Sequence, residues 1–167
     1  MQALGLCWDQ TGIGELEEVH IPRQAPAHRG ARLLLAHWQA REAEGRFVVG
    51  RDVPARPLAK ILSGLMLYEP VDGDFRIRLA GLALLRRFGR DVRGERLSAL
   101  SGAGQFSAHA AQMRALLRTG KPLVVEVRLM QQGRIQLCYE LVALRVFAPD
   151  EQTPWVLAGL FFHDWRL

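Results

Sequence analysis

The residues from Asp74 to Gly94 constrain the fold more than any other part of the chain. Between Phe75 and Leu79 apolar residues alternate with arginines, and this period of two is typical of a half-buried strand. Gly81 ends that strand. From Leu82 to Phe88 the leucines then recur at helical spacing, and Gly89 ends the helix because glycine readily adopts a positive φ. The stretch therefore predicts a strand followed at once by a short helix, which is typical of an α+β domain.

The other elements follow from the same periodicities. A first helix is predicted over Ala31–Glu44, and a strand over Leu65–Val71 that a tight turn joins to the next strand. Further elements are predicted over Gly94–Ser101 (helix), Phe106–Arg118 (helix), Leu123–Met130, Ile135–Phe147 and Trp155–His163 (strands). Hairpins at both ends and a helical crossover between them predict a five-stranded antiparallel sheet with helices on one face. Residues 1–30 are interpreted as a lead-in segment and residues 31–167 as the domain.

Length and composition fit one folded domain. The chain has 167 residues, of which 49% are hydrophobic, so it can fill a core and is not disordered throughout. No apolar run reaches the ~20 residues that a spanning helix needs, and the start lacks the pattern of a secretory signal. We therefore expect a cytoplasmic protein with no membrane partner. Cys7 and Cys138 are interpreted as free thiols.

The net charge of +5 comes almost entirely from arginine. Five arginines fall between Arg86 and Arg96, which suggests either a phosphate-binding patch or a solvated surface. Asp91 and Glu95 interrupt the run, and neither interleaved aromatic residues nor a helix-turn-helix pattern accompanies it. The sequence favours the solvated surface and no nucleic-acid partner.

Four short motifs together resemble the PAS family of sensor domains, most closely a subgroup of short bacterial PAS-like proteins. The motifs are Leu35-x-x-Trp38, Arg51-Asp52-x-Pro54, Arg78-Leu79-Ala80-Gly81 and Phe88-Gly89-Arg90-Asp91-x-x-Gly94. The resemblance spans residues 32 to 165 and implies the PAS fold and a stand-alone sensory or regulatory role. Leu82 departs from the family, which usually has a threonine after the glycine that ends the strand.

The resemblance also implies a pocket between the helical cluster and the inner face of the sheet. The residues that we expect to contact a ligand there are Arg78, Leu85, Phe88, Phe106, His109, Met113 and Tyr139, with Cys138 as an alternative to Tyr139. Most are apolar, so the expected ligand is small and apolar or amphipathic, although such side chains can also simply fill a core. Arg78 could anchor a carboxylate or phosphate, or could join a charge ladder on the outer face. Strand alternation does not say which face is inward.

Cofactors and catalysis find little support in the sequence. His109 has no second ligand at metal spacing, which argues against haem and against a metal site, and Cys138 lies on a predicted strand, which argues against flavin photochemistry. No nucleophile elbow, HExxH, CxxC or phosphate loop occurs, so we expect no enzyme. The alternative is a cone-shaped enzyme or carrier resembling ketosteroid isomerases, which needs a carboxylate in its cavity. Its candidates are Glu126, Glu140 and Asp164.

A module without an output domain has to act through contact with another protein. The helix Ala31–Glu44 is the expected surface, because PAS domains commonly pair through this region. Leu34, Leu35 and Trp38 are the predicted interface residues of a homodimer, as apolar and aromatic anchors often are. The alternative is that this helix covers its own sheet.

Overall fold

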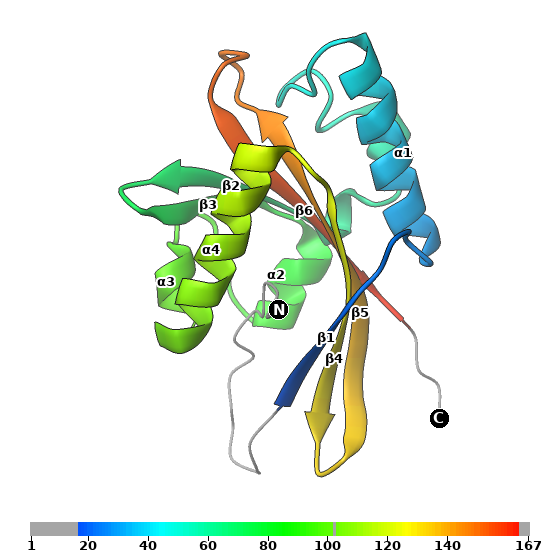
Figure 1. Ribbon diagram of the computed structural model, residues 1–167, viewed down its shortest axis with the longest axis vertical. Helices are drawn as coiled ribbons and strands as arrows, with labels where there is room; N and C mark the ends of the chain where they lie inside the picture. The colour runs from blue at the N-terminus through cyan, green and yellow to red at the C-terminus, as the bar shows by residue number, and fades with distance from the viewer. Residues whose placement is uncertain (1–16, 102, 164–167) are drawn as a thin grey trace.

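A six-stranded antiparallel sheet forms the centre of the computed structural model, which describes residues 17–101 and 103–163 (Figure 1). The strand order is β1-β4-β5-β6-β2-β3. The strands are β1 (Glu17–Pro22), β2 (Leu65–Val71), β3 (Asp74–Ala80), β4 (Leu123–Gln131), β5 (Arg134–Phe147) and β6 (Pro154–Phe162). The predicted α+β class and all five predicted strands are confirmed, with boundaries shifted by a residue or so.

The sixth strand is the difference from the sequence-based expectation. Strand β1 lies within the segment interpreted as a lead-in and pairs antiparallel with β4, so that His20 stands opposite Val127. The segment is short and charged, with only Val19 and Ile21 in alternation with polar residues, and it forms a strand by pairing with β4. The rest of the predicted lead-in up to residue 16, including Cys7, lies outside the described residues.

Helices cover both faces of the sheet (Figure 1). One face packs against α2 (Leu82–Phe88), α3 (Leu97–Leu100) and α4 (Ala103–Thr119), and their shared interior is called the α4-side core below. The other face packs against α1 (Arg29–Glu44) and the short 3-10 turns η1 (Arg56–Leu58) and η2 (Leu62–Gly64), which form the α1-side core. The expectation of helices on one face therefore holds for the cluster after β3, whereas α1 lies on the opposite face.

Helix α1 is fixed to the sheet by its apolar side. Leu34 is fully buried and Trp38 is 8% exposed, both within the α1-side core, and Leu35 is half-buried against it. The Trp38 indole donates a hydrogen bond to the carbonyl oxygen of Arg145 at 2.8 Å. Two of the predicted interface residues thus lie in the chain's own core, as the alternative for this helix had it.

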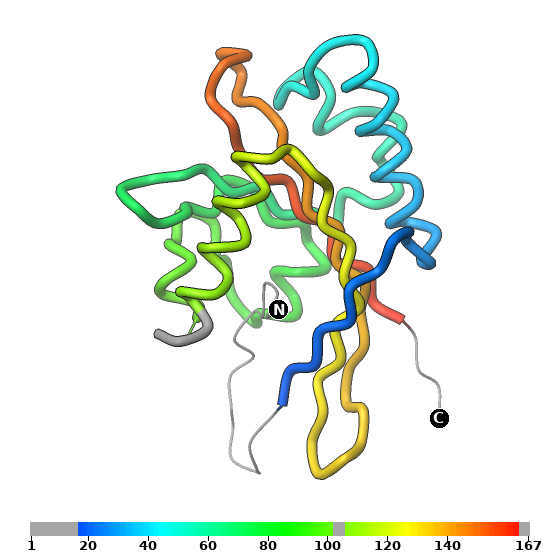
Figure 2. The backbone as a smooth tube through the Cα atoms, in the orientation of Figure 1, coloured from blue at the N-terminus to red at the C-terminus, as the bar shows by residue number. Residues whose placement is uncertain are grey.

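The tube in Figure 2 shows how far the β4–β5 hairpin extends beyond the helical layers. Strand β3 forms the edge of the sheet opposite β1. The loop after α2 covers this edge, because Ile77 exchanges backbone hydrogen bonds with Gly94 and Glu95. Among the described residues, no helix is both long and apolar enough to cross a membrane.

Candidate ligand-binding site

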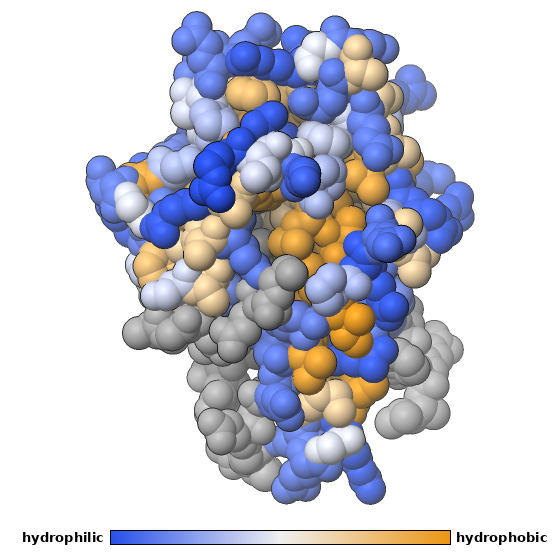
Figure 3. Space-filling view, viewed as in Figure 1, coloured by the Kyte–Doolittle hydropathy of each residue, from blue (hydrophilic) through white to orange (hydrophobic). Residues whose placement is uncertain are grey.

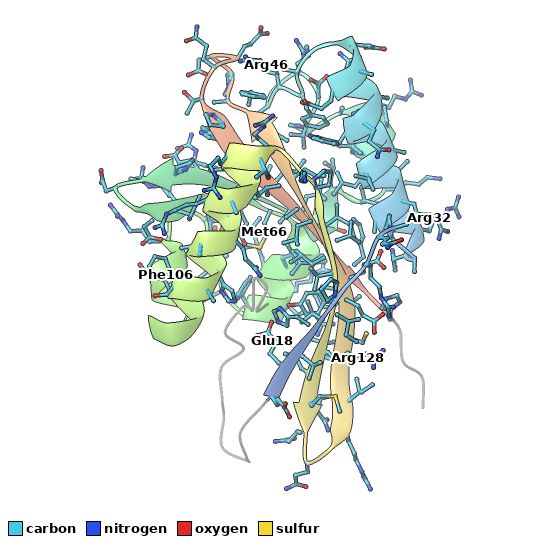
Figure 4. The ribbon with its side chains drawn as sticks, viewed as in Figure 1. Glu18, Arg32, Arg46, Met66, Phe106 and Arg128 are labelled. Carbon is cyan, nitrogen blue, oxygen red and sulfur yellow. The ribbon has the colours of Figure 1, made fainter. Side chains whose placement is uncertain are left out.

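The α4-side core gathers most of the residues that were predicted to contact a ligand. Tyr139 on β5 and Met113 on α4 are fully or almost fully buried in it. Leu85, Phe88 and Phe106 are partly buried and pack against it. Figure 4 shows Met66 of β2 between α4 and the sheet, with Phe106 on α4. Helices after β3 and strands from both ends of the chain therefore converge on one apolar region.

This region also reaches the surface. In Figure 3 apolar atoms gather between α4 and the strands β1 and β4, on the face turned to the viewer. Soluble domains usually cover such surface, and exposed apolar patches often mark a binding site.

Tyr139 carries a buried polar group that lacks, within the described residues, the hydrogen bond such groups normally make. Its side chain is 0% exposed, and its hydroxyl has no hydrogen-bond partner in the part of the chain that the structure describes. Its ring lies 5.2 Å from that of Phe162. Burial raises the pKa of Tyr139 well above its usual value, Glu18 and Tyr68 raise it further, and Arg87 acts against them. The residue is therefore neutral and offers a hydrogen-bond donor inside an apolar core.

Tyr68 is a second buried phenol in the same core. Its hydroxyl donates to the sulfur of Met66 at 3.4 Å, and burial raises its pKa. Sulfur is a weak acceptor, but it leaves Tyr68 satisfied where Tyr139 is not.

Arg87 of α2 is exposed and places a cation at the edge of this core, and the sequence analysis missed it. Its guanidinium lies 3.9 Å from the centroid of the Phe162 ring. Burial lowers the pKa of Arg87, while the neighbouring Tyr139 raises it. Arg87 follows the fully buried Leu84 by three positions, so helical spacing could have placed it next to the buried side of α2. The sequence analysis interpreted the five arginines from Arg86 to Arg96 together as one solvated surface, and so it did not consider Arg87 separately.

Strand β1 adds a carboxylate and an imidazole to the same face. The Nε2 atom of His20 lies 2.7 Å from Oε1 of Glu18, and both side chains are largely buried. In the strand ladder His20 stands opposite Val127, which stands opposite Tyr139. Figure 4 shows Glu18 beside this part of the sheet. This pair was out of reach for sequence reasoning because β1 was taken for a lead-in.

His109 is 2% exposed on α4, on the side that carries Met113 into the core. Among the described residues no three side chains of His, Cys, Asp or Glu are grouped so that they could hold a metal ion. Cys138 neighbours Tyr139 on β5 and therefore points to the opposite face of the sheet.

Arg78 lies on the other side of the sheet from this region. Its Nε atom is 3.2 Å from Oε2 of Glu69, and its guanidinium lies 5.7 Å from the ring of Trp155, which packs against the α1-side core. Arg76 reaches the same carboxylate at 3.5 Å. This placement corresponds to the charge ladder, and not to the anchor for a ligand in the α4-side core.

Two of the carboxylates named for the enzyme alternative, Glu126 and Glu140, lie on the α1 side of the sheet. Glu140 accepts hydrogen bonds from the backbone N–H groups of Ala27 and His28 at 2.8 and 3.1 Å. Glu126, opposite Glu140 in the ladder, pairs with Arg23 and Arg128. Neither faces the α4-side core, and Asp164 lies outside the described residues.

Comparison with known families agrees with this architecture. The family model for the PAS domain matches residues 26–162. No match was found among curated proteins. The matched region includes α1, five of the six strands and the whole helical cluster that encloses Tyr139. Since the match covers most of the chain, this protein belongs to the PAS domain family.

Proposed function

We propose that this chain is a non-catalytic sensory or regulatory module, which responds to a small amphipathic ligand in the α4-side core and passes its state to a partner by contact. Membership of the PAS family supports the sensory role. The observation that carries the ligand proposal is the buried Tyr139 hydroxyl without a hydrogen-bond partner among the described residues. An unpaired buried hydroxyl costs about 1–3 kcal/mol, and an acceptor atom on a ligand would remove that cost.

The surroundings of Tyr139 suggest the chemistry of the ligand. Its apolar part would contact Leu85, Phe88, Phe106 and Met113, which pack in or against the same core. Its polar end would accept the Tyr139 proton, and a carboxylate or carbonyl oxygen there would also be attracted by Arg87. His109 remains a predicted contact from α4.

Replacing Tyr139 by phenylalanine tests the proposal. The purified wild-type protein is expected to carry an extra mass in its native mass spectrum that is absent under denaturing conditions. In Tyr139→Phe the dissociation constant of the ligand should rise about tenfold or more, because one buried hydrogen bond is worth about 1.5 kcal/mol. With the ligand removed from both proteins, the melting temperature of Tyr139→Phe should equal or exceed that of the wild type, since the variant removes an unsatisfied polar atom.

Tyr68→Phe is the matched control, because the Tyr68 hydroxyl is already bonded to Met66. It should retain the extra mass. A bare wild-type protein, or an equal loss of ligand in both variants, would contradict a ligand held by Tyr139.

Contact with a partner needs exposed residues of α1, since Leu34 and Trp38 are buried in the α1-side core. Leu33, on the outer side of the helix, is 37% exposed. We therefore propose that a signalling partner or a second copy would meet α1 on its outer side.

A further inference from the structure

A groove runs between the first turns of α1 and the segment that contains η1. Its lining residues are His28, Arg29, Gly30, Arg32, Leu33, Pro57, Lys60 and Ile61. The groove lies on the α1 side of the molecule, across the sheet from Tyr139. Figure 4 shows Arg32 on α1, on the side of the molecule remote from α4.

The charge of this groove is entirely positive. Arg29, Arg32 and Lys60 line it, and no acidic residue does. None of these three cations forms an ion pair with a carboxylate of the described residues, whereas farther along the chain Arg41 and Arg51 both pair with Asp52. The Arg32 guanidinium donates a hydrogen bond to the carbonyl oxygen of Ala27, but no carboxylate in the described part of the chain pairs with the three cations, which repel one another and favour a bound anion.

Two of these cations also oppose the dipole of their own helix. The first turn of α1 contains no acidic residue but does contain Arg29 and Arg32. The N-terminal end of a helix carries partial positive charge, so cations there are unfavourable by some tenths of a kcal/mol. Glu140 already accepts hydrogen bonds from the N–H groups of Ala27 and His28 just before the helix, and a carboxylate bound in the groove would in addition offset the charges of the three cations.

The walls of the groove are apolar. Leu33 is 37% exposed, Ile61 is half-buried and Pro57 is exposed. Arg32 and Leu33 follow Arg29 by three and four positions along the outer side of α1, while Ala31 and Leu34 face the core. Cations thus flank an apolar strip along one side of a helix.

From this arrangement we propose that the groove docks an acidic amphipathic segment of a partner protein, with its carboxylates on Arg29, Arg32 and Lys60 and its apolar side chains on Leu33 and Ile61. A second copy of this chain fits poorly, because a symmetric pair would bring these cations against themselves. A concave groove does not match a flat lipid surface. A single-stranded nucleic acid also fits poorly, because its bases stack on aromatic side chains. The one aromatic ring among the described residues that line the groove, His28, is already stacked on Phe161 at 5.3 Å.

This inference names the chemistry of the partner in the proposed function, but it does not depend on a ligand at Tyr139. The probe is a fluorescein-labelled peptide of about 14 residues, roughly four helical turns, in which Glu and Leu alternate at helical spacing. Binding to the full chain is measured by anisotropy at about 0.15 M salt. The acidic peptide is expected to bind at least about tenfold more tightly than the same peptide with Gln in place of Glu.

Charge reversal within and outside the groove locates the site. The double variant Arg29→Glu with Lys60→Glu should weaken binding about tenfold or more, and Leu33→Ser should weaken it several-fold. The control is Arg118→Glu with Arg134→Glu, which changes the net charge equally at two exposed residues far from the groove. It should change binding less than about threefold.

Equal losses in the groove and control variants, or equal binding of the Glu and Gln peptides, would overturn the proposal. Binding of duplex DNA or of anionic phosphatidylserine vesicles that only the groove variant abolishes would overturn it as well. Tyr139→Phe should bind the peptide like the wild type. A failure of ligand binding at Tyr139 is therefore distinguishable from a failure of the groove.

Discussion

Gly81, at the junction of β3 and α2, is a residue for which the structure leaves no room for a side chain. Its backbone N–H donates to the carbonyl oxygen of Leu65 at 2.8 Å. A Cβ atom there would lie 2.3 Å from the carbonyl oxygen of Ser63 and 2.4 Å from that of Leu62. Its φ of −67° would suit any residue, so close approach of the backbone is what requires glycine.

Gly81→Ala should therefore lower the free energy of unfolding by about 2–3 kcal/mol, since the atoms that have to move are backbone atoms. Urea denaturation at neutral pH measures the change. Gly89→Asn serves as the control, because Gly89 ends α2 at a φ of 69° with open space around it. Asparagine tolerates that conformation, so a cost of about 1 kcal/mol or less is expected there. Equal costs would refute the steric account.

Asp52, from the Arg51-Asp52-x-Pro54 motif, is a buried carboxylate that joins α1 to the following turn. It accepts a hydrogen bond from the Val48 N–H at 2.7 Å and pairs with Arg51 at 3.0 Å and with Arg41 at 2.9 Å. Burial raises the pKa of Asp52, but the hydrogen bonds from Arg51 and Val48 and the charge of Arg41 outweigh it, so the pKa is lower than usual.

A depressed folded-state pKa means that this carboxylate stabilises the fold above the unfolded pKa of about 3.9. The contribution is lost as the pH falls through the lower folded value. Asp52→Asn should therefore cost about 1–2 kcal/mol at pH 7, and the difference from the wild type should shrink below about pH 4. Urea titrations across this range measure it. Glu44→Gln, which breaks the exposed pair with Arg41, should cost less than about 1 kcal/mol.

At the scale of elements, the start of α1 is tied to the sheet by polar and steric contacts together. Glu140 of β5 is 1% exposed and accepts hydrogen bonds from the N–H groups of Ala27 and His28, just before the helix. The His28 Nδ1 atom accepts from the N–H of Gly30. Gly30 lies against the Phe161 ring, where a Cβ would approach to 2.6 Å. The start of α1, which lines the groove at Arg29, is therefore held against the sheet.

Glu140→Gln should loosen this attachment, because an amide can accept one of the two hydrogen bonds but turns its own N–H₂ toward the other donor. We expect a cost of about 1–3 kcal/mol and faster hydrogen exchange in the first turns of α1. Glu126→Gln changes the opposite residue in the ladder, whose partners are the side chains of Arg23 and Arg128. It should leave exchange in α1 unchanged, and an equal effect there would refute the role of Glu140.

At the scale of the whole molecule, three of the five arginines along residues 86–96 pair with carboxylates, which favours a solvated surface over a phosphate-binding one. Arg90 pairs with Glu95, Arg93 with Asp91 at 2.6 Å and Arg96 with Asp72 at 3.3 Å. A gel-shift assay with mixed-sequence duplex DNA of about 30 base pairs, at about 0.15 M salt, should show no specific complex. A discrete band that survives unlabelled competitor DNA would contradict this expectation.

The order and type of the elements follow from the sequence because they depend on local properties. The alternation before Gly81, the helical spacing up to Phe88 and the left-handed Gly89 predict β3 and α2 without reference to the rest of the chain. The motifs that resemble PAS domains are equally local, and so the family could be anticipated. The packing of Phe106 and Met113 in or against the α4-side core was predictable for the same reason.

The remaining features depend on contacts between distant parts of the chain. Alternation relates Arg78 to Ile77 but does not say which face is inward, and packing against Glu69 and Trp155 decided it. The sequence allows a short ordered piece over Leu16–Ile21, but its pairing with β4 as a sixth strand, and the place of Glu18 beside Tyr139, required the tertiary structure. The burial of Tyr139 without a hydrogen-bond partner, and the groove between α1 and Lys60, likewise required the tertiary structure. Local periodicity sets secondary structure, whereas burial and charge pairing depend on which elements meet in space.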